Sequence, residues 1–223
     1  CRKRGSLDST EEILLDQNEL AQGHDYFRVG VFAVSPSHRL LAYSTDTAGS
    51  EMFTLRIKDL ENGKLLPDEI LNTYYSVVWA NDDRTVFYTT FDSAKRPYKV
   101  YRHVLGTDPS TDQLVHHEQD EKYHVSISKT RSRRFILLSS NSMVTYEVRF
   151  LDADRPTGEF KIIHPRQQGM EYSVEHHGDH FYIVTNDEAR NFKLMKAPTA
   201  KPSKDNWTEI IAHRPTVKID DVD

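Results

Sequence analysis

The sequence contains almost no cysteine: Cys1 is the only one in 223 residues. A single thiol excludes a disulfide within the chain and fits a reducing compartment. Long hydrophobic runs are also absent, since no stretch approaches the roughly 18 apolar residues that a membrane-spanning helix needs. Positive charge is not in excess either, because the net charge is -5 and the isoelectric point is near 6.1. These absences give no reason to expect a membrane or a nucleic acid as partner.

Aromatic and charged residues are plentiful by contrast. Eleven Tyr and ten Phe supply large apolar area for a core, and the chain is 37% hydrophobic and 28% charged. Such a composition is typical of a soluble globular chain rather than a disordered one, and the length fits one large or two small domains. The chain starts at Cys1 without a methionine and stops in the strand-like stretch "TVKIDDVD". We therefore expect a fragment of a longer protein.

A repeated unit occurs four times along the sequence. Each unit has a strand, a polar tip, an apolar strand, a second tip, an amphipathic strand, a turn and a short outer strand. The first strands are centred on valines spaced 44, 47 and 49 residues apart, namely Val34, Val78, Val125 and Val174. Val, Ile, Tyr, Phe and Thr dominate the strands, and Asp, Asn, Gly and Pro cluster between them. The second strands, such as "RFILLSS", are nearly continuously apolar, which indicates burial on both faces between neighbouring sheets.

Four strands per unit at this spacing predict an all-β fold, a β-propeller of four-stranded antiparallel blades, of which this chain supplies about four. A β-sandwich is the alternative, but it gives no reason for a fixed four-strand period. The stretch "EEILL" at 11–15 matches the position of a fourth strand. The expected organisation is an outer strand of a preceding blade with a lead-in segment at 1–30, complete blades at 31–72, 73–119, 120–168 and 169–214, and the first strand of a further blade at 215–223. Such an open array exposes blade edges, through which self-association is possible.

Many short motifs, in a consistent order, resemble the prolyl oligopeptidase family. "LDQNELA" at 15–21 resembles the start of that family's propeller, and "VSPSHRLLAYSTDTAGSEMFTLRIKDL" at 34–60 resembles its first complete blade. The segment 77–107 continues the likeness with Trp79, Asp92 and Phe87-Tyr88. Three further elements are similar to the oligopeptidase B (protease II) branch of the family: Arg96-Pro97, Leu105-Gly106-Thr107 and Glu118-x-Asp120.

The resemblance implies a seven-bladed propeller that caps an α/β-hydrolase domain in a cytoplasmic serine oligopeptidase. Such enzymes cleave short peptides after Arg or Lys, and the propeller filters out large folded substrates. The family's nucleophile lies in a Gly-x-Ser-x-Gly elbow, and this motif does not occur in the 223 residues. We therefore expect the hydrolase domain to be absent from this chain, which then carries no catalytic residue and is inactive alone.

Charged residues near the expected strand ends are the candidate functional residues. Carboxylates there could attract a short basic peptide and raise its local concentration. Arginines beside prolines, including Arg155, could form ion pairs with the hydrolase domain of the same parent chain. The alternative is that Asp caps turns and Glu lies on solvated faces. The candidates for substrate steering or domain contact are Asp46, Glu51, Asp92, Arg96, Glu118, Asp120, Glu121, Glu147 and Arg166.

No metal or cofactor is expected. The pairs His116-His117 and His176-His177 cannot chelate an ion as pairs, because adjacent residues of a strand point to opposite faces. Ser, His and Asp are abundant, but geometry defines a catalytic triad. Trp79 and Tyr88 are expected to pack between blades. The alternative function, from another class, is a non-catalytic β-propeller that serves as a protein-interaction scaffold.

Overall fold

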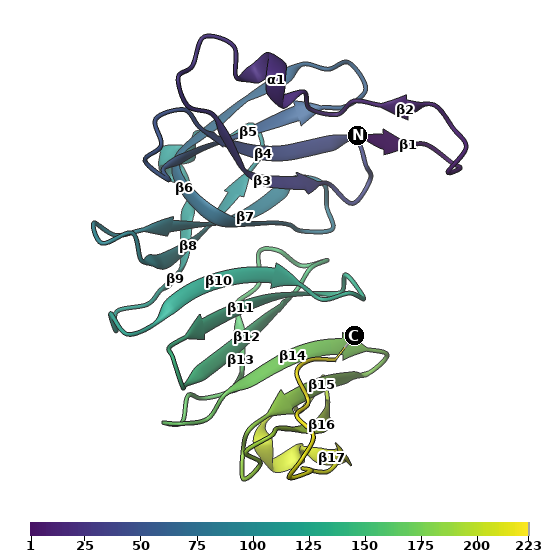
Figure 1. Ribbon diagram of the computed structural model, residues 1–223, viewed down its shortest axis with the longest axis vertical. Coiled ribbons are helices and arrows are strands. Elements are labelled where there is room, and N and C mark those ends of the chain that lie inside the picture. Colours follow the sequence, from purple (N-terminus) through teal and green to yellow (C-terminus); the bar gives the residue numbers. More distant parts are fainter. Residues whose placement is uncertain (223) are drawn as a thin grey trace.

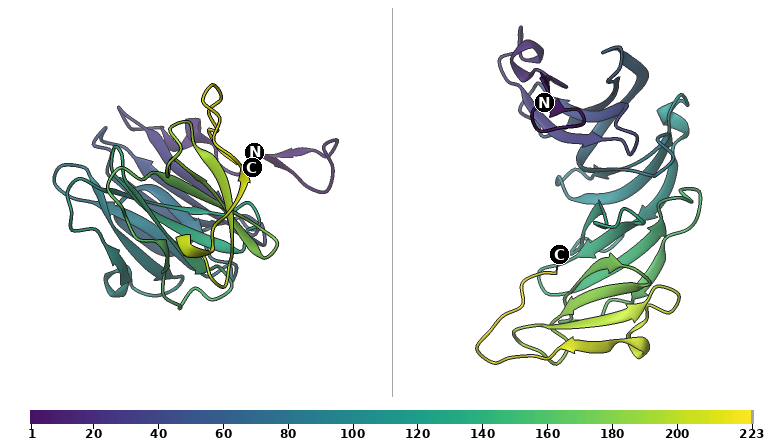
Figure 2. Two further views of the ribbon diagram at one scale, coloured as in Figure 1. Left: turned by 90° about the horizontal axis from the view of Figure 1, so that it is seen from below. Right: turned by 90° about the vertical axis from the view of Figure 1, so that its right-hand side faces the viewer.

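Antiparallel strands are the main secondary structure of the chain. The computed structural model describes residues 1–222, and its sheets follow one another in chain order along the long axis of the molecule (Figure 1). Within each sheet, hydrogen-bonded neighbours are strands that are consecutive in sequence. This repeated up-and-down order confirms the predicted all-β fold of four-stranded propeller blades. Over the described residues the stack is curved and does not close on itself, as the side view in Figure 2 shows.

The first two blades share a strand. Blade A consists of β3 (Arg28–Val34), β4 (Leu40–Asp46), β5 (Phe53–Asp59) and the first half of β6 (Leu65–Trp79). Blade B consists of the second half of β6 with β7 (Thr85–Phe91), β8 (Pro97–Val104) and β9 (Gln113–His117). Thr73 is where β6 changes partner, because it pairs with both β5 and β7. The boundary expected between residues 72 and 73 thus falls inside one continuous strand, next to the left-handed Asn72 (φ 58°).

Blades C and D are separate four-stranded sheets. Blade C consists of β10 (His124–Lys129), β11 (Phe135–Asn141), β12 (Tyr146–Asp152) and β13 (Lys161–His164). Blade D consists of β14 (Tyr172–His177), β15 (His180–Thr185), β16 (Lys193–Pro198) and β17 (Thr208–Ile211). Two loops join these blades to the chain before them: the B–C connector at 118–123 and the C–D connector at 165–171.

Both ends of the chain differ from the sequence-based expectation. Of "EEILL", only Glu11–Glu12 forms a strand (β2), and it pairs with β1 (Arg2–Lys3) instead of extending a blade. Leu14 packs against Leu41 and Tyr43 instead, since burial on blade A removes its side chain from water. The short helix α1 (Gln17–Leu20) follows it. No strand forms over residues 215–222, where the first strand of a further blade was expected; the segment has only an isolated bridge between Arg214 and Val217. Asp223 lies outside the described residues.

Apolar side chains fill the layers between successive blades. In β11, Ile136 and Leu138 belong to the core shared with blade B, whereas Phe135 and Leu137 belong to the core shared with blade D. This alternation explains why the second strands are apolar on both faces. Trp79 and Tyr88 lie in the core between blades A and B, as expected. Within residues 1–222, no helix is long and apolar enough to cross a bilayer.

The up-and-down order gives the blades two distinct ends. Turns between first and second strands lie at the tip end. Turns between second and third strands lie at the opposite end, together with the B–C and C–D connectors, and we call this the connector end. All of the candidate charged residues except Arg155 lie at the connector end. The fold therefore brings together groups that are far apart in sequence.

Candidate functional site

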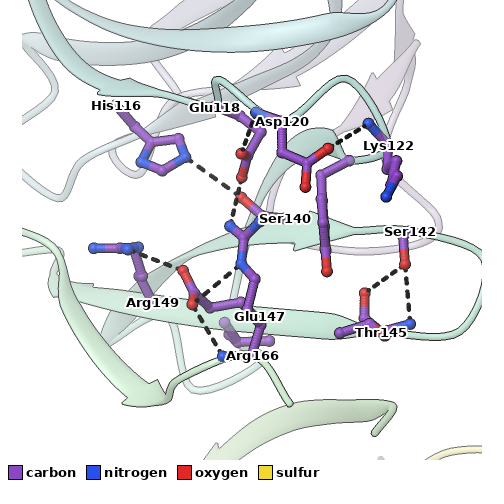
Figure 3. A network of polar contacts seen from close by, with 12 residues as sticks. His116, Glu118, Asp120, Lys122, Ser140, Ser142, Thr145, Glu147, Arg149 and Arg166 are labelled. Atoms are coloured by element: carbon purple, nitrogen blue, oxygen red, sulfur yellow. Dashed lines mark hydrogen bonds and ion pairs between the residues drawn. The ribbon is translucent and has the colours of Figure 1, made fainter. Parts of the chain in front are cut away.

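An ion-pair network centred on Arg166 occupies the connector end (Figure 3). Nη2 of Arg166 donates to Oε2 of Glu118 at 2.5 Å, and its backbone N–H donates to Oε2 of Glu147 at 3.1 Å. Glu118 follows β9, Glu147 lies in β12, and Arg166 lies in the C–D connector. The network therefore ties blade B and blade C to the segment that leads into blade D.

The two carboxyl groups of this network are buried in their charged form. The side chains of Glu118 and Glu147 are each 6% exposed, against 28% for Arg166. Burial alone would raise the pKa of Glu118, but the hydrogen bonds from Arg166 and from the backbone of Asp120 hold that pKa below its ordinary value. Burial likewise opposes the lowered pKa of Glu147, which hydrogen bonds from the Arg166 backbone and from Arg149 maintain. The arginine thus neutralises charges that water cannot reach.

His116 extends the network on the β9 side. Its Nε2 lies 3.4 Å from Oγ of Ser140, and burial, together with the nearby Arg149 guanidinium, lowers the pKa of the ring. Arg149 itself donates to Oε1 of Glu147 at 2.9 Å. The neighbouring His117 lies beside Tyr98, with 5.3 Å between ring centroids. Among the described residues, no group of three or more His, Cys, Asp or Glu side chains is placed to hold a metal ion.

Arg96 ties the turn between β7 and β8 to the B–C connector. Nε of Arg96 donates to Oδ2 of Asp92 at 2.9 Å, and Nη1 donates to the backbone carbonyls of Asp120 (3.2 Å) and Tyr123 (3.0 Å). Burial opposes the lowered pKa of Asp92, and hydrogen bonds from the backbone and side chain of Arg96 outweigh it. The Arg96-Pro97 motif therefore has a structural use, which is to position the connector between blades B and C.

The remaining acidic candidates divide into one engaged and three exposed side chains. Asp46 is buried and caps the turn after β4, accepting from the backbone N–H groups of Ala48 and Glu51. The side chains of Glu51, Asp120 and Glu121 are exposed. Glu51 lies 3.8 Å from Arg28, a distance at which an exposed pair contributes little. These three carboxylates are the ones that a soluble cation can reach.

A buried polar cluster between blades A and B was not predicted from the sequence. Nε2 of His103 lies 2.9 Å from Oδ1 of Asp68, and Nδ1 lies 2.7 Å from Oδ1 of Asp112. None of the three side chains is more than 2% exposed. Aspartate is depleted in strands. Asp68, within the strand-like run that forms β6, was therefore the sequence feature that could have indicated a buried polar contact. Alternation along β8 also places His103 on the same face as Tyr101, a partly buried aromatic.

A serine and a histidine meet at the tip end, in a cavity of about 540 Å³ lined by residues of blades C and D and by Val222. Oγ of Ser132 lies 2.7 Å from Nδ1 of His176, whose ring packs edge-on against Phe135. The nearby carboxylate of Glu175 accepts from the backbone N–H groups of Arg131 and His176. Within residues 1–222, Nε2 of His176 has no hydrogen-bond partner, so the pair lacks the carboxylate that orients the ring in a catalytic triad.

Successive four-stranded antiparallel blades, with charged connectors at one end, define the chain as a β-propeller module. The family described as "Prolyl oligopeptidase, N-terminal beta-propeller domain" matches residues 1–223, and the chain belongs to this family. The family assignment made from the motifs is thus confirmed.

Curated relatives and solved structures support the oligopeptidase B branch. The chain is 42% identical over 212 residues to dipeptidyl aminopeptidase BI of Pseudoxanthomonas mexicana, covering 94% of this chain and 29% of the relative. It is 39% identical over 193 residues to protease 2 of Moraxella lacunata, covering 86% of this chain and 28% of that relative. Oligopeptidase B from Leishmania major superposes with a TM-score of 0.86 at 31% identity, covering 96% of this chain and 30% of that structure. The chain therefore spans about a third or less of the length of these relatives.

Proposed function

We propose that this chain is the propeller part of a serine oligopeptidase that hydrolyses short peptides after Arg or Lys, and that the propeller acts as its gate. The observation that carries the proposal is that blades occupy the described chain from residue 28 to 211, while the relatives are about three times longer. The chemistry then belongs to an α/β-hydrolase domain elsewhere in the parent chain. A cytoplasmic location follows from the same proposal.

The gating role uses both kinds of charged residue at the connector end. The buried pairs of Arg166 and Arg96 hold the connectors in place, which keeps blade spacing fixed and limits the size of peptide that passes. Glu51, Asp120 and Glu121 are exposed and face solvent, so they attract a basic peptide by long-range electrostatics. Glu118 and Glu147 are engaged with arginines and contribute little to this attraction.

Removal of N-terminal dipeptides is a second candidate activity of the parent protein, and one relative supports it. The relative with 42% identity is named a dipeptidyl aminopeptidase, which predicts removal of N-terminal dipeptides by the parent protein. A propeller alone does not select between these reactions, because the groups that bind the scissile residues belong to the catalytic domain. A non-catalytic scaffold is the third alternative, and a parent sequence without a Gly-x-Ser-x-Gly elbow would favour it.

Peptide-cleavage assays of the parent protein distinguish these functions. We expect cleavage of N-terminally blocked peptides after Arg or Lys, and no cleavage of a folded protein that carries the same sites. Cleavage that requires a free amino terminus two residues from the bond would favour the aminopeptidase. The isolated 223-residue chain serves as the control, and inhibitor-sensitive turnover by it would contradict the assignment of chemistry to another domain.

Electrostatic attraction has a separate test in the parent enzyme. Replacing Asp120 by Asn and Glu121 by Gln should raise KM for a dibasic peptide roughly threefold at low salt, with little effect at high salt, where the charges are screened. A neutral peptide of the same length is the matched substrate control. Equal changes in KM for both peptides would remove the electrostatic role.

A further inference from the structure

The buried cluster of Asp68, His103 and Asp112 lies across the boundary between blades A and B. Asp68 belongs to the half of β6 that pairs with blade A, whereas His103 lies in β8 of blade B. Asp112 follows the short helix η1 (Pro109–Thr111), just before β9. One imidazole ring therefore links two carboxylates on opposite sides of a blade boundary.

The cluster has further hydrogen bonds to the backbone and to Tyr88, while Oδ2 of Asp68 is buried without a partner among the described residues. Oδ1 of Asp68 also accepts from the backbone N–H of Gly106 at 2.6 Å, and Oδ2 of Asp112 accepts from the hydroxyl of Tyr88 on β7 at 2.9 Å. The ring of Tyr101 on β8 stacks on Tyr88. In the described part of the chain, neither carboxylate is paired with a lysine or an arginine. His103 is thus the cation available to this cluster.

The hydrogen bonds at both ring nitrogens favour a doubly protonated ring. An imidazolium has an N–H at each nitrogen and can donate to both carboxylates at once. A neutral imidazole has one N–H, so the lone pair of its other nitrogen would face a buried carboxylate oxygen. Burial alone would lower the pKa of His103, but the hydrogen bonds with Asp112 and Asp68 outweigh it and raise that pKa above its ordinary value.

We propose that the Asp68–His103–Asp112 cluster is a pH-sensitive clamp that holds blade A against blade B while His103 carries two protons. The rest of this boundary is an apolar core with further hydrogen bonds around it. The Trp79 indole N–H donates to the carbonyl of Ala33, the Ser37 backbone N–H donates to Oδ1 of Asp83, and Nζ of Lys95 donates to the carbonyl of Ser50. Because β6 runs through both blades, loss of the clamp opens the contact locally and leaves the strand continuous.

The direction of the pH dependence follows from the raised pKa. The clamp contributes its full stability below the pKa that the ring has in the opened state. It is lost as the pH rises through the higher pKa of the closed state. Between these two values the equilibrium for opening increases roughly tenfold per pH unit. Mild alkalinity, rather than acid, therefore loosens the boundary between blades A and B.

Hydrogen exchange of the full-length parent protein, read out peptide by peptide, tests the clamp. After correction for intrinsic exchange, peptides covering 65–72 and 97–106 should lose protection between pH 6 and pH 9, while peptides of β11 and β15 keep theirs. Asp112→Asn should move this loss to lower pH, because one of the two carboxylates that stabilise the imidazolium is removed. His103→Gln should remove the pH dependence, and His124→Gln, at an exposed histidine of β10, is the matched control.

Two outcomes would overturn the proposal. In the first, the protection of peptides 65–72 and 97–106 from hydrogen exchange changes with pH in the same way as that of β11 and β15 in the unsubstituted protein. In the second, the loss of protection stays at the same pH in Asp112→Asn. Both measurements remain informative if His103→Gln fails to fold.

Discussion

At the scale of single residues, most charged side chains that suggest substrate steering in the sequence are engaged within the fold. Glu118, Glu147 and Asp92 are each hydrogen-bonded to an arginine, and Asp46 caps a turn. The reason is physical: a buried carboxylate is stable as an anion only where donors replace its water. Exposure, rather than residue type, separates the groups that hold the blades from those that a peptide can reach.

Removing the central cation of the Arg166 network should destabilise the chain. Arg166→Ala leaves the nearly buried carboxylate of Glu118 without its guanidinium and leaves Glu147 paired with Arg149 alone, so we expect a loss of about 3 kcal/mol in the free energy of unfolding. Arg190→Ala, at an exposed arginine before β16, should change it by less than about 0.5 kcal/mol. Urea unfolding of the two variants measures the difference. Similar midpoints for both would mean that the network adds no stability.

Acid should weaken the same network. The pKa of Glu118 is lowered in the folded chain, so its contribution is complete above the ordinary value near 4.5 and is lost as the pH falls through the folded-state pKa. Glu118→Gln should therefore be less stable than the unsubstituted chain at pH 7, and the two stability curves should converge toward pH 3. Unfolding midpoints measured from pH 3 to pH 7 provide the test. A constant gap between the curves would contradict it.

At the scale of strands and blades, local patterns predicted the architecture well. Period-two alternation, continuously apolar second strands and regular turn signals are all properties of short windows, and they predicted a fold of four-stranded blades. Patterns could not show that β6 serves two blades, because its change of partner depends on pairing with both β5 and β7. They also missed His103 with Asp68, separated by 35 residues, and could not pair Glu118 with Arg166, separated by 48. Such contacts are set by blade packing and leave no periodic signal.

Close packing within blade A depends on the absence of a side chain at Gly30. A Cβ there would lie 2.6 Å from ring atoms of Phe53 and 2.9 Å from Oγ of Ser44. Gly30→Ala should therefore destabilise the chain by about 2 kcal/mol through overpacking. Adding Phe53→Leu should cost less in this background than in the unsubstituted chain, because the smaller side chain relieves the clash. Strictly additive losses in thermal unfolding would show that Gly30 and Phe53 do not interact in this way.

At the scale of the whole molecule, the curved stack leaves strand edges that no other strand covers in the described chain. β17 pairs with β16 on one side, and its Ile210 and Ile211 are 43% and 41% exposed. An exposed apolar edge strand is a template for pairing with a second copy, and lysine on an edge opposes such pairing. We therefore expect the isolated chain to self-associate, and Ile211→Lys to weaken that association roughly tenfold in sedimentation velocity. Met143→Lys is the control, since Met143 is 94% exposed but lies in the turn between β11 and β12. If both lysine variants weaken association equally, general apolar exposure drives it, and if neither does, the edge of β17 is not the contact.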